Sequence, residues 1–351
     1  MNLNYSALGQ KTSKKLIAIA KWALLLSVAF LLLGFAFKDI DFNHIVSEIA
    51  NANFFWVFLS FFISAAANMI RAVRWKLLIE PMDYHPLLRK TFYAVMTGYL
   101  ANFAFPRLGE VTRCGSLAKA EKIPFNKLLG TVITERIIDV ISLLVCIVIV
   151  MVIEFSRLGN FLKDNIIGPG LDKFQSIASP IVMVIAMMIL IALTILIFRY
   201  LKRKDNRFSH LLKGVAEGIM SVRTLKKPWL FIFHSVFIWF LYFLSVYVAF
   251  FGMKPTENLS LSAALFLLVA GGVAMSAPVQ GGIGAYHLLV SKGLLLYGLT
   301  YEQGLAFATL LHSLQIILSV LLGSISFLLL FISKKERISR QNDVELTKPA
   351  S

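Results

Sequence analysis

The chain has 351 residues, of which 58% are hydrophobic and only 15% are charged, and its mean hydropathy is +0.76. Soluble domains carry about a quarter charged residues, so this composition excludes a soluble globular protein and indicates a chain that folds in a lipid bilayer. The net charge of +16 does not indicate nucleic-acid binding, because the basic residues lie in short clusters between apolar runs, as in the cytoplasmic loops of membrane proteins.

Six apolar runs, each of about 20 residues or more, predict helices that cross the hydrocarbon core of a bilayer. In chain order these runs are 16–37, 54–70, 128–153, 180–198, 228–251 and 304–332. Two further apolar regions are interrupted: 87–118 by a polar turn at Pro106, and 261–299 by a Pro/Gly-rich break at 278–284. We expect each of these two regions to turn back on itself rather than to form one plain span.

The distribution of Lys and Arg predicts the orientation, because cytoplasmic loops carry an excess of both. The basic segments, which we place in the cytoplasm, are 1–15, 199–227 and 333–351. The loops that we place outside are 38–53, 154–179 and 252–260. Basic residues flank 87–118 on both sides, so this region is predicted to be a re-entrant hairpin from the cytoplasmic face. Region 261–299 is predicted to be a hairpin from the opposite face, although three ordinary crossings in the last third fit the charges equally well.

The predicted fold class is therefore an all-α polytopic membrane protein with about six full spans plus two oppositely directed re-entrant helical hairpins. A cytoplasmic segment, 1–15, would precede a transmembrane domain, 16–332, and a disordered cytoplasmic tail, 333–351, would follow it. We expect a multi-pass protein of the inner (plasma) membrane with both termini in the cytoplasm. Irregular backbone at membrane depth is tolerated only where it is buried in protein or lines a cavity, so hairpin tips that meet are typical of transporters.

The strongest local motif is the polar turn at 102–113, which reads Asn-x3-Pro-Arg-Leu-Gly-Glu-x2-Arg. Pro106 ends a helix and Gly109 permits a tight turn, so Arg107 and Glu110 are placed at a helix break inside the membrane. Ionisable groups at this depth are functional by default, and the arginine fork suits a phosphate. The alternative is an Arg107–Glu110 pair that only holds the turn. The candidate substrate residues here are Asn102, Arg107, Glu110 and Arg113.

A second motif, Glu135-Arg136-x2-Asp139, lies on the predicted helix 128–153. Glu135 and Asp139 are four residues apart and share a face, while Arg136 points elsewhere and needs a partner such as Glu110. A buried structural ion network and a direct role in substrate binding are equally compatible with this pattern. All three residues are candidates for the substrate site.

Arg71 and Arg74-Trp75 follow the second span. Arg and Trp at such a position favour an interfacial anchor. Arg71 is nevertheless kept as a candidate substrate residue, because it could face a cavity.

The glycine-rich break, Pro278-x2-Gly-Gly-x-Gly-x-Tyr-His, is the third motif. No strand precedes it and no Lys-Ser/Thr follows it, so it is not a nucleotide-binding loop. We expect an unwound hairpin whose free amides face an anion, with a simple packing kink as the alternative. His287 and His312 are expected to lie within side-chain contact, bridging this hairpin and the last span. The candidate substrate residues here are Gly281, Gly282, Gly284, Tyr286, His287, His312 and Gln315.

Together these three motifs resemble those of the lysylphosphatidylglycerol synthase transmembrane region, also described as a flippase-like domain family. The family pattern Asn-x3-Pro-x-Arg-x-Gly-Glu occurs here with one residue fewer, and the resemblance covers about 16–332. It implies lipid-linked work: bifunctional members join this region to a cytosolic tRNA-dependent lipid synthase domain, and the membrane region moves the modified lipid outward. No synthase domain is expected in this chain. Many members carry Glu at the position of His287 and Arg at that of His312, so an acid–base pair is replaced by a His–His pair.

The leading hypothesis is a lipid translocase, or an accessory to one, for an anionic or polyprenyl-phosphate-linked lipid, and thus a transporter rather than an enzyme. One alternative is an integral-membrane transferase acting on a lipid-linked sugar, in which Glu110, Glu135 and Asp139 would supply carboxylates. Another is a non-catalytic envelope scaffold. The expected partner is a membrane lipid, with an envelope enzyme or a second copy of the chain as further candidates and no nucleic acid. No cofactor and no metal are expected, because two histidines do not make a metal site.

Overall fold

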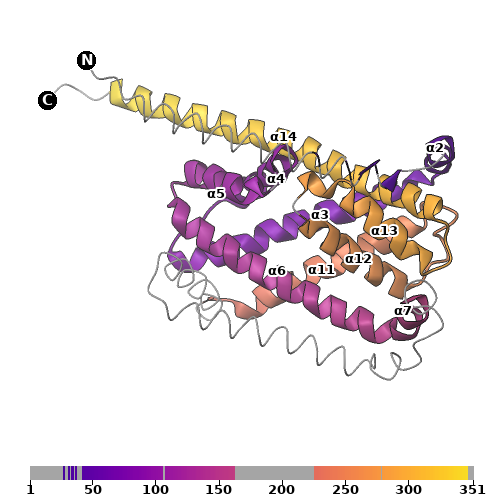
Figure 1. Cartoon of the computed structure of the whole chain (residues 1–351). Coiled ribbons are helices and arrows are strands. Elements are labelled where there is room, and N and C mark those ends of the chain that lie inside the picture. The colour runs from indigo at the N-terminus through magenta and orange to yellow at the C-terminus, as the bar shows by residue number, and fades with distance from the viewer. Residues whose placement is uncertain are drawn as a thin grey trace, which may run out of the picture.

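The computed structural model describes residues 42–105, 107–162, 225–277 and 279–346, together with single positions between 27 and 37. These residues form helices joined by short turns and include no strand (Figure 1). The helices are α2 (Phe42–Ala50), α3 (Phe54–Ile79), η1 (Glu80–Met82), α4 (Leu88–Ala104), α5 (Leu108–Glu121), α6 (Phe125–Ile153), α7 (Phe155–Leu162), α11 (Pro228–Phe250), α12 (Leu261–Ser276), η4 (Gln280–Gly282), α13 (Ala285–Leu295) and α14 (Tyr301–Leu346).

Four of these helical stretches are long and apolar enough to cross a membrane: Phe54–Met82, Phe125–Ile153, Pro228–Phe250 and Tyr301–Ile332. They coincide with four of the predicted spans, and large apolar side chains such as Phe55 (68% exposed) and Phe331 (62% exposed) point outward from them. Such surfaces require a lipid environment, which confirms an all-α, multi-pass membrane protein. The predicted span 180–198, and most of 16–37, lie outside the described residues.

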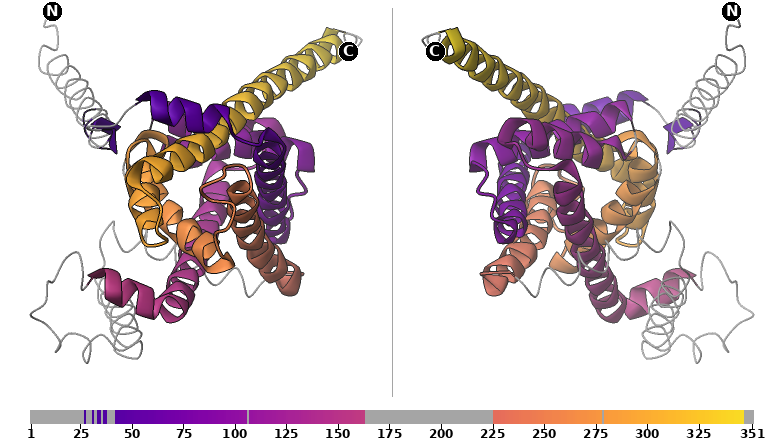
Figure 2. Two further views of the ribbon diagram at one scale, coloured as in Figure 1. Left: turned by 90° about the vertical axis from the view of Figure 1, so that its right-hand side faces the viewer. Right: turned by 90° about the vertical axis from the view of Figure 1, so that its left-hand side faces the viewer.

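The helices pack through small side chains and hydrogen bonds. This is expected in a bilayer, because the lipid tails are as apolar as the helix surfaces and the hydrophobic effect does not drive the helices together. α3 packs along α11, where the Ser60 hydroxyl donates to the Ser245 carbonyl at 2.8 Å. α14 crosses over α4 at Gly323, where a Cβ would lie 2.7 Å from the Cβ of Leu100. Figure 2 shows the C-terminal part of α14 projecting away from the other helices.

The first predicted hairpin is a helix–turn–helix formed by α4 and α5. The two helices approach closely at Gly98, where a Cβ would lie 2.8 Å from the Gly109 carbonyl oxygen and 2.9 Å from the Cβ of Arg113. Asn102 holds the turn, because its Oδ1 accepts a 2.7 Å hydrogen bond from the Gly109 amide. Arg107 occupies the left-handed region at φ 63°, which reverses the chain into α5.

The second predicted hairpin runs from α12 through η4 into α13. Gly281, Gly282 and Gly284 all have positive φ, at 57°, 76° and 82°, a conformation that glycine adopts without strain. Gly281 lies directly against the Phe103 ring at the end of α4. The two turns therefore contact each other, as expected for opposed hairpins, while their depth in the bilayer remains a prediction.

Two predicted boundaries differ from the structure. The second span does not end at residue 70, because α3 continues to Ile79 and carries its arginines into the protein interior. The tail was predicted to be disordered, yet α14 continues to Leu346. Its sequence beyond the span is rich in Lys, Arg and Glu and contains neither Gly nor Pro before Pro349, so helix propensity favours this extension.

Candidate functional site

A network of ion pairs joins α3, α5 and α6, and Glu135 of α6 is its centre. The Glu135 side chain has no exposed surface. It accepts two hydrogen bonds from Arg113, at 3.3 and 2.5 Å, and this guanidinium also lies 4.0 Å from the centre of the Trp75 ring. The indole N–H of Trp75 donates to Thr131 at 2.8 Å. Arg113 is therefore held by the Glu135 carboxylate and by the Trp75 ring, while its Nε has no hydrogen-bond partner among the described residues.

Arg71 and Arg74 of α3 bind the same carboxylates from the other side. Arg71 contacts Asp139 and lies 3.3 Å from Glu135, and Arg74 lies 2.8 Å from Asp139 and 3.3 Å from Glu135. Arg71 also donates to Tyr99 on α4 and Arg74 donates to Ser235 on α11, while the Nε of each has no hydrogen-bond partner among the described residues. The interpretation of Arg71 and Arg74 as interfacial anchors is wrong, because both are buried and paired.

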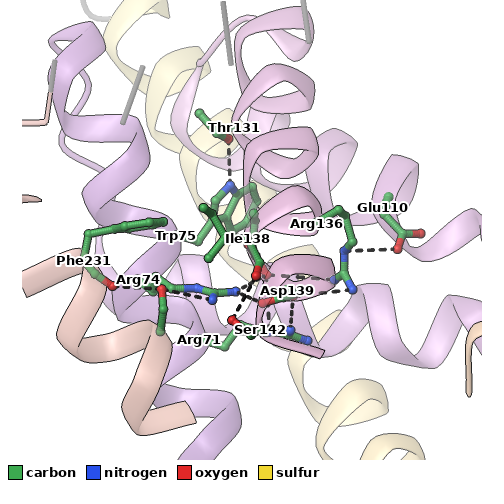
Figure 3. A network of polar contacts seen from close by, with 12 residues as sticks. Arg71, Arg74, Trp75, Glu110, Thr131, Arg136, Ile138, Asp139, Ser142 and Phe231 are labelled. Atoms are coloured by element: carbon green, nitrogen blue, oxygen red, sulfur yellow. Dashed lines mark hydrogen bonds and ion pairs between the residues drawn. The ribbon is translucent and has the colours of Figure 1, made fainter. Parts of the chain in front are cut away.

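Arg136 is the peripheral member of the network. Its side chain is 40% exposed, and its nearest carboxylate oxygens are those of Glu110 at 3.6 Å, Glu135 at 3.9 Å and Asp139 at 3.9 Å. Figure 3 shows Arg136 between Asp139 and Glu110, at the edge of the cluster away from Arg74. The predicted partnership of Arg136 with Glu110 is confirmed.

Among the residues that the structure describes, the network carries more positive than negative charge. Four guanidinium groups, of Arg71, Arg74, Arg113 and Arg136, face three carboxylates, of Glu110, Glu135 and Asp139. The formal sum is one positive charge in excess. Because Arg136 pairs with Glu110, the excess lies among Arg71, Arg74 and Arg113, which face only Glu135 and Asp139, and Arg136 is the member of the network that meets the surface.

Arg107 does not join this network. It is exposed, and no ion pair links it to Glu110 or to any other described residue. The alternative of a turn held by an Arg107–Glu110 pair is therefore wrong, because the left-handed conformation of Arg107 directs the chain into α5 while Glu110, one turn later, faces α6. The Asn102 amide holds the turn instead.

The histidine cluster is a separate site at the second turn. His287 and His312 lie with ring centres 5.1 Å apart, which confirms their predicted contact, and Tyr286 stacks on His312 at 4.8 Å. His312 Nε2 is 2.8 Å from the Gly281 carbonyl, and the Gly284 amide donates to His287 Nδ1 at 3.4 Å. These contacts tie the turn to α14. Gln315, one helical turn later, is half-buried.

Some residues of the arginine network were not predicted to belong to the site. They are Arg74, Trp75, Tyr99, Thr131 and Ser235. For Arg74 the sequence did contain a usable signal. Arg71 and Arg74 are three residues apart and share one helix face, and Glu135 and Asp139, four residues apart, share a face of another helix. Two buried carboxylates on one face require cations, and a matching pair of arginines on another helix supplies them.

Comparisons with known proteins agree with this architecture. A UPF0104 membrane protein from Methanocaldococcus jannaschii is 30% identical over 126 residues, which are 35% of this chain and 38% of that protein. The chain thus matches well under half the length of this relative. No solved structure matches the chain. The family model described as the lysylphosphatidylglycerol synthase TM region matches residues 21–323, and the chain therefore belongs to that family.

Proposed function

We propose that the protein moves an anionic or polyprenyl-phosphate-linked lipid between the leaflets of the inner (plasma) membrane. The observation that carries this proposal is the excess guanidinium charge of the buried network and its accessible member, Arg136. An intramembrane charge costs about 2.5–3.5 kcal/mol on insertion scales, so an excess cation within the network calls for an anion, and Arg136 is the member that an anion can reach. A lipid phosphate is the anion that the bilayer offers.

Arginine is suited to this ligand. Its planar fork binds a phosphate through two parallel hydrogen bonds, and such charge-assisted bonds are about twice as strong as neutral ones. The three buried arginines orient the carboxylates around Arg136, so the fork is held in place before the ligand arrives. The proposal thus assigns Arg136 the direct contact and Arg71, Arg74 and Arg113 the task of positioning.

The two contacting turns support transport rather than simple binding. Gly281 at the second turn lies against Phe103 at the first, and the second turn is built from glycines in the left-handed region. Broken helices that meet in this way are the usual location of substrate sites in secondary transporters. On this proposal both termini and 199–227 lie in the cytoplasm, since those segments are basic.

A transferase for lipid-linked sugars fits the geometry less well. Such chemistry needs a carboxylate that is free to act as a base or to bind a metal. Glu135 and Asp139 are instead each held by two or more arginines, which leaves Glu110 as the one carboxylate of the network that is only loosely paired. We therefore do not favour a catalytic role for these carboxylates.

The test compares two arginine variants in vesicles that carry a fluorescent phosphatidylglycerol and a quencher confined to the outside. Arg136→Gln should slow transport about tenfold or more, the value of one charge-assisted hydrogen bond. Arg136→Lys should restore it poorly, because a point charge replaces the fork. The matched control is Arg157→Gln, because Arg157 is similarly exposed (45%) and pairs with Glu154, away from the site. Equal transport by Arg136→Gln and the wild type would contradict the proposal.

A further inference from the structure

The Glu110–Arg136 contact is the loosest ion pair that joins separate helices in the network. Its shortest distance is 3.6 Å, whereas Arg74 lies 2.8 Å from Asp139 and Arg113 lies 2.5 Å from Glu135. Both partners are also partly exposed, Glu110 by 29% and Arg136 by 40%. An exposed pair at this distance contributes little to stability, so the contact is easily exchanged.

Both partners also have unused hydrogen-bonding capacity. Among the described residues, Glu110 Oε2 is the one buried carboxylate oxygen without a hydrogen-bond partner. Arg136 Nε is also buried without a hydrogen-bond partner, as are the Nε atoms of Arg71, Arg74 and Arg113, so the unpaired carboxylate oxygen is what distinguishes this pair. Buried polar atoms are normally satisfied, and each exception calls for an explanation. Here the explanation is a carboxylate that fits the arginine fork imperfectly.

The position of Glu110 links this pair to the first turn. Glu110 lies in the first turn of α5, directly after the reversal at Arg107, and Arg136 lies on α6. One helical turn beyond Glu110, Arg113 anchors α5 firmly to Glu135. Loss of the Glu110 contact would therefore remove the tie between the start of α5 and α6, while Asn102 still holds the turn and Arg113 keeps the rest of α5 attached.

We propose that Glu110 is an internal substitute for the lipid phosphate. In this structure its carboxylate partly neutralises Arg136, and a phosphate that binds Arg136 displaces it and releases the start of α5 from α6. This inference rests on the proposed function, because it takes the ligand to be a lipid phosphate. The phosphate binds better than Glu110 because a free lipid headgroup can take the two-hydrogen-bond geometry that Glu110, fixed on α5 at 3.6 Å, does not reach, and because it compensates the excess positive charge of the network.

This exchange predicts an effect that a structural pair would not produce. If Glu110 only stabilised the fold, Glu110→Gln would leave lipid binding unchanged or weaken it. If Glu110 competes with the phosphate, the same variant binds lipid more tightly, because the competitor is gone. The gain must also depend on Arg136, so it must vanish in the double variant Glu110→Gln/Arg136→Gln.

The experiment measures the affinity of the purified full-length chain for short-chain phosphatidylglycerol, for a polyprenyl phosphate and for phosphatidylcholine. Glu110→Gln should lower the Kd for whichever phosphate lipid is the ligand about tenfold. Arg136→Gln and the double variant should bind it weakly, and Arg136→Lys should fall between. Glu154→Gln is the matched control, since it removes the carboxylate of the distant Arg157 pair, and it should bind as the wild type does. Comparison of the two phosphate lipids distinguishes a phospholipid from a polyprenyl carrier.

Three results would overturn the inference: an unchanged or raised Kd in Glu110→Gln, a gain that persists without Arg136, or no binding of either phosphate lipid by the wild type. Thermal unfolding of each variant shows whether a change in affinity reflects loss of fold. Failure of the inference differs from failure of the proposed function. If Glu110→Gln binds lipid more tightly but the wild type transports none, only the proposed transport is contradicted. If the wild type transports lipid but Glu110→Gln does not change its affinity, only the proposed exchange is contradicted.

Discussion

Replacement of Glu135 by Gln tests whether the arginine network holds the membrane domain together. Glu135 is fully buried and contacts Arg113, Arg71 and Arg74 at 3.3 Å or less. Gln keeps the shape and removes the charge, so four guanidinium groups would face two carboxylates instead of three. Removal of one partner from a buried ion pair costs about 3–5 kcal/mol, because the other charge is left uncompensated. We expect a loss of unfolding free energy of this size.

The control makes the same change at the surface. Glu80 pairs with Lys76 at 3.8 Å across one helical turn, and both side chains are partly exposed. Glu80→Gln should cost about 0.3–0.5 kcal/mol at most. Adding Arg113→Gln to Glu135→Gln should recover part of the loss, because it removes one uncompensated cation.

The assay is equilibrium unfolding in mixed detergent micelles, followed by circular dichroism. A Glu135→Gln variant no less stable than Glu80→Gln would refute the reasoning that the network is a structural support for Arg136. A double variant that loses as much as the sum of its two single variants would show that Arg113 and Glu135 are not energetically coupled.

Two further predictions concern the second turn and the topology. Gly281→Ala should lower the free energy of unfolding by about 1 kcal/mol or more beyond the loss in Gly298→Ala. Both glycines have positive φ, but only a Cβ at Gly281 would meet Phe103. Thermal unfolding of both variants checks this, and equal losses would count against the contact between the turns. A single cysteine at Ser209, in a background without the two native cysteines, should resist an impermeant thiol reagent added to intact cells; labelling from outside would reverse the proposed orientation.

The membrane-spanning helices could be predicted from the sequence because length and apolar composition decide them. Helix α6, for example, was expected at 128–153 and occupies Phe125–Ile153. The turns at Pro106 and at 278–284 were also predictable, since Pro and Gly interrupt otherwise apolar helices. Contact between the two turns was expected from two opposed hairpins, which is one of the two arrangements that the distribution of basic residues allows for the last third of the chain.

The pairing of the charges could not be predicted with the same success. Arg71 and Arg74 lie more than 60 residues before their partner Asp139 along the chain. An Arg followed by a Trp near the end of an apolar run looks the same in sequence whether the pair anchors the helix at the membrane interface or is buried in the protein. Only the tertiary contacts distinguish the two cases. Arg107 and Glu110 were assigned to one site because they are close in sequence, but the left-handed turn at Arg107 separates their directions.

The central claim, movement of an anionic lipid by this protein, is tested most directly by the headgroup dependence of transport. Wild-type protein is reconstituted into vesicles with fluorescent phosphatidylglycerol or with phosphatidylcholine of the same acyl chains, and the rate of transfer between leaflets is compared with protein-free vesicles. A polyprenyl phosphate serves as a third lipid. The account predicts that a lipid with a net negative phosphate headgroup crosses clearly faster than phosphatidylcholine. Transfer at the protein-free rate for every lipid, or equal acceleration of anionic and zwitterionic lipids, would contradict it.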